Sequence, residues 1–145
     1  KTSRTVQAIL GGIGAITLLV AALGITNTMI MSIYERTKEI GIMKVIGATF
    51  SDIHSLFLVE AGMIGFIGGT LGLGLSYGVS AIINHIAGQF LNSGMAMEEA
   101  IKISLIPPYL ALFAVGFAII VGLVAGLYPA YRAVRLSPIS AIRNE

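Results

Sequence analysis

The sequence predicts an all-α integral membrane protein with three transmembrane helices and a short cytoplasmic helix between the first and the second. Hydrophobic residues make up 56% of the chain and charged residues only 11%, and the mean hydropathy is +0.92. Soluble domains carry about 25% charged residues. The charges are also unevenly placed, because none lies in residues 5–34, 61–97 or 103–131. This composition excludes an ordinary cytosolic enzyme, a disordered tail and a nucleic-acid-binding protein.

Three apolar stretches are predicted to cross the membrane, at residues 8–33, 53–83 and 107–128. The hydrocarbon core of a bilayer is about 30 Å thick and is spanned by about 20 apolar residues in a helix. The first stretch is too long for the apolar part of a signal peptide, which has about 7–15 residues. A soluble bundle is disfavoured, because three helices that are apolar on every side could not bury one another completely.

The distribution of Lys and Arg predicts the orientation of the spans, since cytoplasmic loops are enriched in both. The link between the first two spans and the tail at residues 131–145 lie on one side. Together they carry Arg36, Lys38, Lys44, Arg132, Arg135 and Arg143. The opposite side carries fewer bases, namely Lys1, Arg4 and Lys102. The link and the tail are therefore predicted to be cytoplasmic, and residues 84–106 form the external connection.

We call the link at residues 35–52 the elbow. Glu35 and Arg36 follow the first span directly, so one helix is expected to continue out of the membrane. Possible pairs of Glu35 with Lys38 and of Arg36 with Glu39, each three residues apart, would support it. The elbow has as many acids as bases, which argues against a polybasic lipid-binding strip.

A short amphipathic helix near the membrane surface is expected inside the elbow. Ile42, Val45 and Ile46 form an apolar stripe, and Gly41 and Gly47 on either side allow sharp changes of direction. The sequence T-x-x-D at residues 49–52 is a start signal for the next helix.

The external connection and the third span contain helix-breaking residues. Gly88 and Gly94 are expected to interrupt the connection, and a surface helix is expected over residues 97–104. Pro107 and Pro108 open the third span, where a missing N–H is harmless. Pro129 is expected to kink or end that span.

Small residues recur at every fourth position in the second and third spans. This spacing lets two helix backbones approach closely in a membrane. The positions expected to pack helices together are Gly65, Gly69, Gly72, Ala118, Gly122 and Gly126. Two alternatives remain open: the rows pack within this chain, or some of them face a second protomer.

The sequence contains no recognisable catalytic or cofactor motif. A phosphate-binding G-x-x-x-x-G-K-[ST] loop and an H-E-x-x-H zinc motif are absent, and there is no cysteine for a thiolate metal site. His54 and His85 are predicted on opposite sides of the membrane, so neither metal nor cofactor is expected in this chain. Glu60 is the acid that lies well inside a predicted span. Such a carboxylate is a functional candidate, although a structural role near the cytoplasmic end is favoured here and an ion-coupled carrier is disfavoured.

The segment NTMIMSIYERTKEIGIMKVIGATFSD at residues 27–52 resembles the signature of MacB/FtsX-like permeases of ATP-binding-cassette systems. The glycine-rich second span after Glu60 is similar as well, as is the ending GLYPAYRAVRLSPISAIR. The resemblance is strongest to the MacB-like branch. The residues that carry it are Asn27, Thr28, Met29, Glu35, Arg36, Glu39, Ile40, Gly41, Lys44, Gly47, Ala48, Pro129, Ala130, Ala133, Pro138, Ala141 and Arg143.

The resemblance implies an architecture larger than this chain. Family permeases have a first helix, a large extracytoplasmic domain and then three further helices. Residues 1–145 match only those three helices, as a single permease domain without the first helix and the extracytoplasmic domain. Because the chain begins with Lys1, we expect it to be part of a longer or processed protein.

The elbow corresponds by this resemblance to the family's coupling helix, which docks on a separate or fused ABC ATPase subunit. The expected contact residues are Glu35, Arg36, Glu39, Ile40, Gly41, Met43, Lys44, Gly47 and Ala48. ATP and Mg²⁺ would bind in the partner ATPase and not in this chain. A second permease protomer, membrane lipid and a periplasmic or extracellular adaptor are the further implied partners, and the implied location is the bacterial cytoplasmic (inner) membrane.

The function implied is that of a non-enzymatic, multi-pass permease subunit for export or mechanotransmission. It would couple ATP hydrolysis by the partner to motion across the membrane, with efflux of drugs, peptides or lipophilic compounds. The alternative is a non-transport membrane regulator that relays an ATPase signal to an extracytoplasmic cell-wall hydrolase or sensor.

Overall fold

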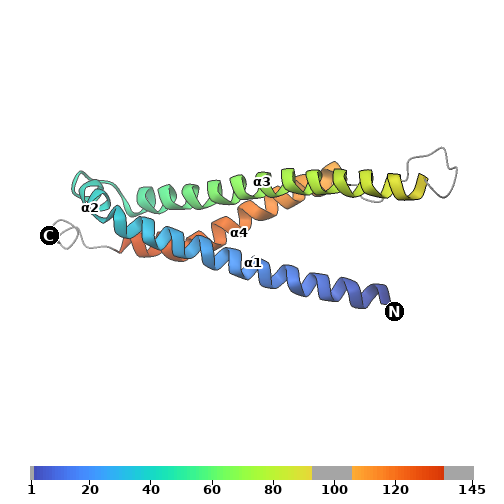
Figure 1. Ribbon diagram of the computed structural model, residues 1–145. Coiled ribbons are helices and arrows are strands. Elements are labelled where there is room, and N and C mark those ends of the chain that lie inside the picture. Colours follow the sequence, from blue (N-terminus) through green and yellow to red (C-terminus); the bar gives the residue numbers. More distant parts are fainter. Residues whose placement is uncertain (1, 93–105, 136–145) are drawn as a thin grey trace.

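The protein is described by a computed structural model of residues 2–92 and 106–135, in which every regular element is a helix. Helix α1 spans Thr2–Glu35, α2 spans Thr37–Val45, α3 spans Phe50–Asn92 and α4 spans Pro108–Val134. Helices α1, α3 and α4 are long and apolar enough to cross a membrane, and the short α2 lies across one end of them (Figure 1). The predicted all-helical fold with three membrane spans is confirmed. The end at which α2 lies is called the elbow end, and the opposite end the far end.

The helices extend beyond the predicted spans. Helix α1 begins at Thr2, and α3 continues through Gly88 to Asn92. The expected break at Gly88 is wrong, because a single glycine costs a helix only about 1 kcal/mol relative to alanine. At 1.5 Å per residue the 43 residues of α3 measure about 64 Å, twice the thickness of a bilayer core. The surface helix expected at residues 97–104 and the tail beyond residue 135 lie outside the described residues.

Pro129 does not end α4, which continues to Val134. A proline has no N–H, so the carbonyl of Ala125, four residues earlier, loses its partner within the helix. The hydroxyl of Thr26 on α1 lies 2.9 Å from that carbonyl and can donate a hydrogen bond to it. The same hydroxyl lies 2.9 Å from the carbonyl of Ala22 in its own helix. Helix α1 therefore satisfies the acceptor that Pro129 leaves open in α4.

Helices α3 and α4 pack closely through small residues. A Cβ added at Gly65 would lie 2.5 Å from the carbonyl oxygen of Ala118, and one at Gly122 would lie 2.6 Å from that of Ala61. Gly69 faces the Cβ of Ala118 in the same way, and Gly126 faces Ala61. The row formed by Ala61, Gly65 and Gly69 thus faces α4 of its own chain.

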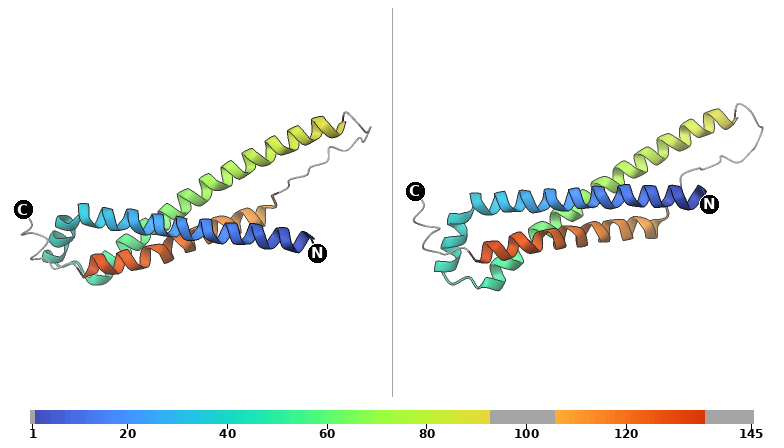
Figure 2. Two further views of the ribbon diagram at one scale, coloured as in Figure 1. Left: turned by 60° about the horizontal axis from the view of Figure 1, so that its bottom comes forward. Right: turned by 90° about the horizontal axis from the view of Figure 1, so that it is seen from below.

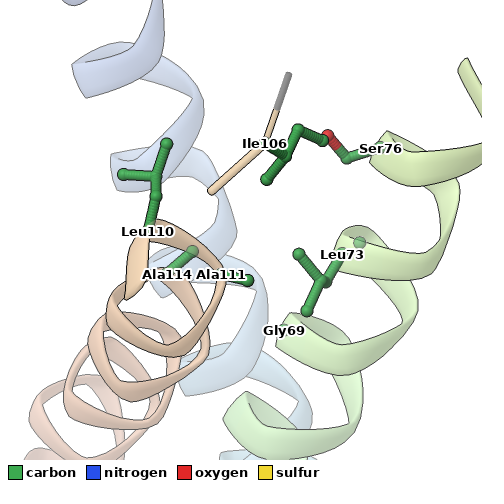
Figure 3. Close-up of a pocket in the computed structure, with 8 residues that line it drawn as sticks. Gly69, Leu73, Ser76, Ile106, Leu110, Ala111 and Ala114 are labelled. Carbon is green, nitrogen blue, oxygen red and sulfur yellow. The ribbon is translucent and has the colours of Figure 1, made fainter. Parts of the chain in front are cut away.

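A second set of glycines on α3 has open space around it. A Cβ at Gly72 would meet nothing within 4 Å, and the same holds for Gly68, Gly74 and Gly78. Gly72 therefore does not pack in the helix contact predicted for it, because α3 and α4 diverge there (Figure 2). The divergence leaves an apolar pocket of about 280 Å³, with the Ser76 hydroxyl at its wall (Figure 3). It is lined by Gly69, Gly72, Leu73, Ser76, Ile106, Leu110, Ala111 and Ala114.

The hydrophobic core lies at the elbow end of the molecule. Its largest fully buried side chains are Met29, Ile40, Ile53 and Phe57, which come from all of the first three helices. Helix α4 completes the core with Ala130, Ala133 and Val134. The half of α1 toward the far end is exposed along its whole length, and the helices separate in that direction (Figure 2). The chain is therefore tightly packed at one end and open at the other.

Replacing Gly65 by alanine is expected to destabilise the protein by about 1–3 kcal/mol, because the new methyl group would press on the backbone of α4. Gly68→Ala adds the same group to the same helix where nothing lies within 4 Å, so it is the matched control and is expected to be neutral or to stabilise the helix by up to about 1 kcal/mol. Unfolding of both variants by SDS in mixed micelles would measure the difference. Equal stability of the two variants would contradict the packing described.

Thr26→Val is expected to lower the free energy of unfolding by about 1 kcal/mol, because the Ala125 carbonyl loses its donor. In a Pro129→Ala background residue 129 regains an N–H for that carbonyl, and the cost of Thr26→Val should largely disappear. A double-mutant cycle in mixed micelles measures this coupling. An unchanged cost in the alanine background would show that Thr26 does not compensate for Pro129.

Candidate functional site

The junction between α1 and α2 is a sharp bend without a flexible linker. Helix α1 ends at Glu35, and the single residue Arg36, with φ −100° and ψ 15°, separates it from α2. Backbone hydrogen bonds continue through the bend, from Arg36 N–H to the Ser32 carbonyl and from Ile40 N–H to the Arg36 carbonyl, both at 3.0 Å. The Thr37 hydroxyl lies 2.9 Å from the carbonyls of Ile33 and Tyr34. A displacement of α2 must therefore bend or move α1.

The inner face of α2 is fixed to the hydrophobic core. Ile40 is 0% exposed, Gly41 is buried, and the half-buried Met43 packs on the same cluster. The ammonium group of Lys44 donates a hydrogen bond of 2.5 Å to the carbonyl of Val134 at the end of α4. The last carbonyls of a helix have no partner within it, so Lys44 caps α4. Partial burial of the ammonium group removes water from it and lowers the pKa of Lys44.

The turn from α2 into α3 is hydrogen-bonded at both of its ends. Gly47 has a φ of 102°, its N–H donates to the Lys44 carbonyl, and the N–H of Ala48 donates to the Met43 carbonyl at 2.9 Å. These bonds form a Schellman motif, in which glycine is preferred for its positive φ. At the start of α3, Thr49 and Asp52 exchange the hydrogen bonds of a capping box. The glycine and the T-x-x-D sequence were the signals for this turn, and both act as predicted.

Glu60 lies opposite the bend. Its carboxylate is 3.9 Å from the Arg36 guanidinium, and this is the ion pair found within residues 2–92 and 106–135. The expected pairs of Arg36 with Glu39 and of Glu35 with Lys38 do not form, and the Arg36 guanidinium faces Glu60 instead. Glu60 thus connects α3 to the α1–α2 junction.

The outer face of the elbow is apolar at its centre. Ile42, Val45, Ile46 and Phe50 are exposed by 47%, 65%, 78% and 68%. Glu35, Lys38 and Glu39 are exposed beside them, and Lys44 lies 5.4 Å from the centre of the Phe50 ring. The apolar stripe predicted from the sequence therefore exists, and it points away from the core of this chain. We call Ile42, Val45, Ile46 and Phe50 the outer apolar face.

The predicted contact residues separate into two groups in the structure. Those that are accessible to a partner are Glu35, Arg36, Glu39 and Gly47. Those that fix α2 to the rest of the chain are Ile40, Gly41, Met43, Lys44 and Ala48. The outer apolar face was not predicted among the contacts, although the spacing of residues 42, 45 and 46 was a signal for it. Thr26 was not predicted either, because a single sequence offers no signal for its role.

Within the described residues no three His, Asp or Glu side chains come together as metal ligands. His54 and His85 stand at the two ends of α3, about 46 Å apart along its axis at 1.5 Å per residue. The geometry of the elbow is suited to transmit force, with a fixed inner face and an accessible outer face.

Comparisons with known proteins show that the chain is similar in sequence to ABC transporter permeases. The chain is 37% identical over 145 residues to the ABC transporter permease YknZ of Bacillus subtilis, covering all of this chain and 33% of that protein. It is 40% identical over 156 residues to the ABC transporter permease MJ1507 of Methanocaldococcus jannaschii, covering 36% of that protein. It is 39% identical to the macrolide export ATP-binding/permease protein MacB of Bdellovibrio bacteriovorus, of which it covers 20%.

The chain thus spans about a third or less of the length of these relatives. Residues 11–138 match the family described as FtsX-like permease C-terminal. With three apolar helices in the structure, this match makes the chain part of a multi-pass membrane permease. The chain belongs to the FtsX-like permease family of ABC transporters.

Proposed function

We propose that the elbow is the coupling element of an ABC export or mechanotransmission permease, and that it receives motion from an ATPase subunit on the cytoplasmic side. The observation that carries the proposal is the division of α2 into two faces. Its inner face is anchored by the fully buried Ile40, and its outer face exposes apolar and charged side chains. An exposed apolar patch rimmed by charges is typical of a protein–protein contact.

The anchoring of α2 gives the motion three routes into the membrane. The hydrogen-bonded bend at Arg36 leads to α1, the Lys44–Val134 bond leads to α4, and the capped turn at residues 47–52 leads to α3. A push on α2 therefore displaces the elbow ends of all three helices together. The helices separate toward the far end, so the displacement changes the spacing between them there. Such movement of whole helices is a rigid-body mechanism.

The remaining components belong to partners of this chain. ATP and Mg²⁺ bind in the ATPase subunit, because this sequence has no phosphate-binding loop. A second permease protomer and lipid cover the exposed half of α1, and an adaptor outside the membrane completes the assembly in a bacterial inner membrane. The relative from Bdellovibrio bacteriovorus is named for macrolide export. For this chain we propose the broader class of drugs, peptides and lipophilic compounds as exported substrates.

Site-directed crosslinking tests where the ATPase binds, and none of the 145 residues is a cysteine that would compete with the introduced one. Cysteine at Val45 on the outer apolar face is expected to crosslink to the ATPase subunit in the full-length complex. Cysteine at Gln7, which is exposed near the other end of α1, is the matched control and is expected not to crosslink. Crosslinking from Gln7→Cys but not from Val45→Cys would refute the proposed orientation.

Two substitutions in α2 separate binding from coupling. Ile46→Asp places a charge on the outer apolar face and is expected to weaken ATPase binding by tenfold or more, with little effect on stability, because Ile46 is 78% exposed. Ile40→Ala leaves that face intact but creates a cavity, at a cost of about 2–5 kcal/mol. It is expected to preserve ATPase binding and to abolish substrate-stimulated ATP hydrolysis. The milder Ile40→Val controls for general unfolding.

The readouts are pull-down of the ATPase and its hydrolysis rate in proteoliposomes, with and without exported compounds. If Ile40→Ala couples as well as the wild type, the rigid elbow is not the transmission element. If a substitution on the outer apolar face changes the rate of ATP hydrolysis but no drug, peptide or lipophilic compound does, the result favours the regulator over the exporter.

A further inference from the structure

Two arginines at the elbow end of α4 have no acidic partner among the described residues. Arg132 lies in the last turn of α4 and Arg135 is its C-cap residue, and both are exposed. The ion pair found among the described residues joins Arg36 to Glu60 instead. Residues three apart on a helix are neighbours, with Cβ atoms roughly 5–6 Å apart. Two cationic side chains therefore start one helical turn apart at this end of α4, and neither forms an ion pair with a described acid.

A tyrosine holds each of these guanidinium groups in place. Arg132 donates a hydrogen bond of 2.5 Å to the hydroxyl of Tyr34 on α1, and its guanidinium carbon lies 5.4 Å from the centre of that ring. Arg135 donates to the hydroxyl of Tyr131, and its guanidinium carbon lies 4.5 Å from the ring centre. A guanidinium has five N–H donors. Each arginine is therefore positioned by one contact and retains donors for a ligand.

The location of the pair matches the headgroup region of a membrane. Residues 103–131 carry no charge, so Arg132 is the first charged residue after the third apolar span. Tyrosine and arginine at the end of a span are typical of the membrane–water interface. The described acids of this end lie on other helices. Asp52 accepts hydrogen bonds from Thr49 and Glu60 faces Arg36, while Glu35 and Glu39 are exposed and form no ion pair with either arginine.

We infer that Arg132 and Arg135, positioned by Tyr34 and Tyr131, bind the phosphate of an anionic phospholipid. Basic sites between transmembrane helices are suited to such headgroups, and guanidinium groups bind phosphate oxygens through paired hydrogen bonds. Phosphatidylglycerol fits better than phosphatidylcholine, because neither arginine is neutralised by an ion pair with a described acid and an anionic headgroup supplies the missing negative charge. Since Tyr34 belongs to α1 and Arg132 to α4, the lipid binds where these two helices meet. This site does not depend on the ATPase contact proposed above.

The test uses the whole permease in nanodiscs of phosphatidylcholine that contain a minority of phosphatidylglycerol. Spin-labelled forms of the two lipids report their relative association with the protein. The wild type should prefer phosphatidylglycerol, and Arg132→Gln and Arg135→Gln should each reduce that preference about fivefold. Tyr34→Phe removes one positioning hydroxyl and should give a smaller loss.

The controls are Lys38→Gln, which removes an exposed cation at the same end, and Arg4→Gln, which removes one near the far end. Both should leave the preference unchanged. A wild type without preference, or an equal loss in Lys38→Gln, would overturn the site in favour of diffuse attraction. Displacement of the labelled lipid by inorganic phosphate at constant ionic strength would overturn the lipid assignment. Unchanged lipid preference in both arginine variants, with loss of ATPase binding in detergent, would make the pair a protein contact instead.

Discussion

The complete burial of Ile40 is the constraint on which the elbow depends. A nine-residue helix has too few hydrogen bonds to be stable alone in water. Helix α2 persists because one isoleucine inserts among the ends of the long helices, where it meets Met29 and Ile33 of α1, Phe57 of α3 and Ala133 of α4 in one cluster. The Lys44–Val134 bond, the hydrogen-bonded bend at Arg36 and the capped turn at residues 47–52 then fix its direction. A cavity in place of the Ile40 side chain would loosen the attachment of the outer apolar face to the long helices.

The distribution of packing along the molecule explains why the elbow end is rigid and the far end open. At the elbow end, large apolar side chains fill the space between the helices. In the middle, Gly65 and Gly122 bring α3 and α4 together through their backbones. Beyond Gly72 the two helices separate and leave an apolar pocket. The mechanism proposed above, in which motion at the elbow end displaces the far end, requires helices that are tightly packed at the elbow end and separated at the far end.

Much of this fold could be predicted from the sequence, because membrane insertion imposes strong rules on single segments. The charge-free runs located the three spans, and Gly47 with the T-x-x-D sequence located the turn into α3. The inner face of α2 was not predictable. Ile40 and Met43 lie on one side of this short helix and Ile42, Val45 and Ile46 on another, so its hydrophobicity has no clear direction. The pairs Arg36–Glu60 and Thr26–Ala125 join distant segments, and local pattern carries no information about them.

The position of the Thr26 hydroxyl has a consequence for sliding between α1 and α4. One proton lies within reach of two acceptors, the carbonyl of Ala22 in its own helix and that of Ala125 across the interface. If α1 withdraws from α4, the donor turns back to Ala22 and is never left unsatisfied in lipid. Separation then exposes a single carbonyl, and the energetic barrier to it is lower than for an interface in which both donor and acceptor lose their partners. Pro129 and Thr26 together make a bond between two spans that is specific in position and yet easily broken and remade.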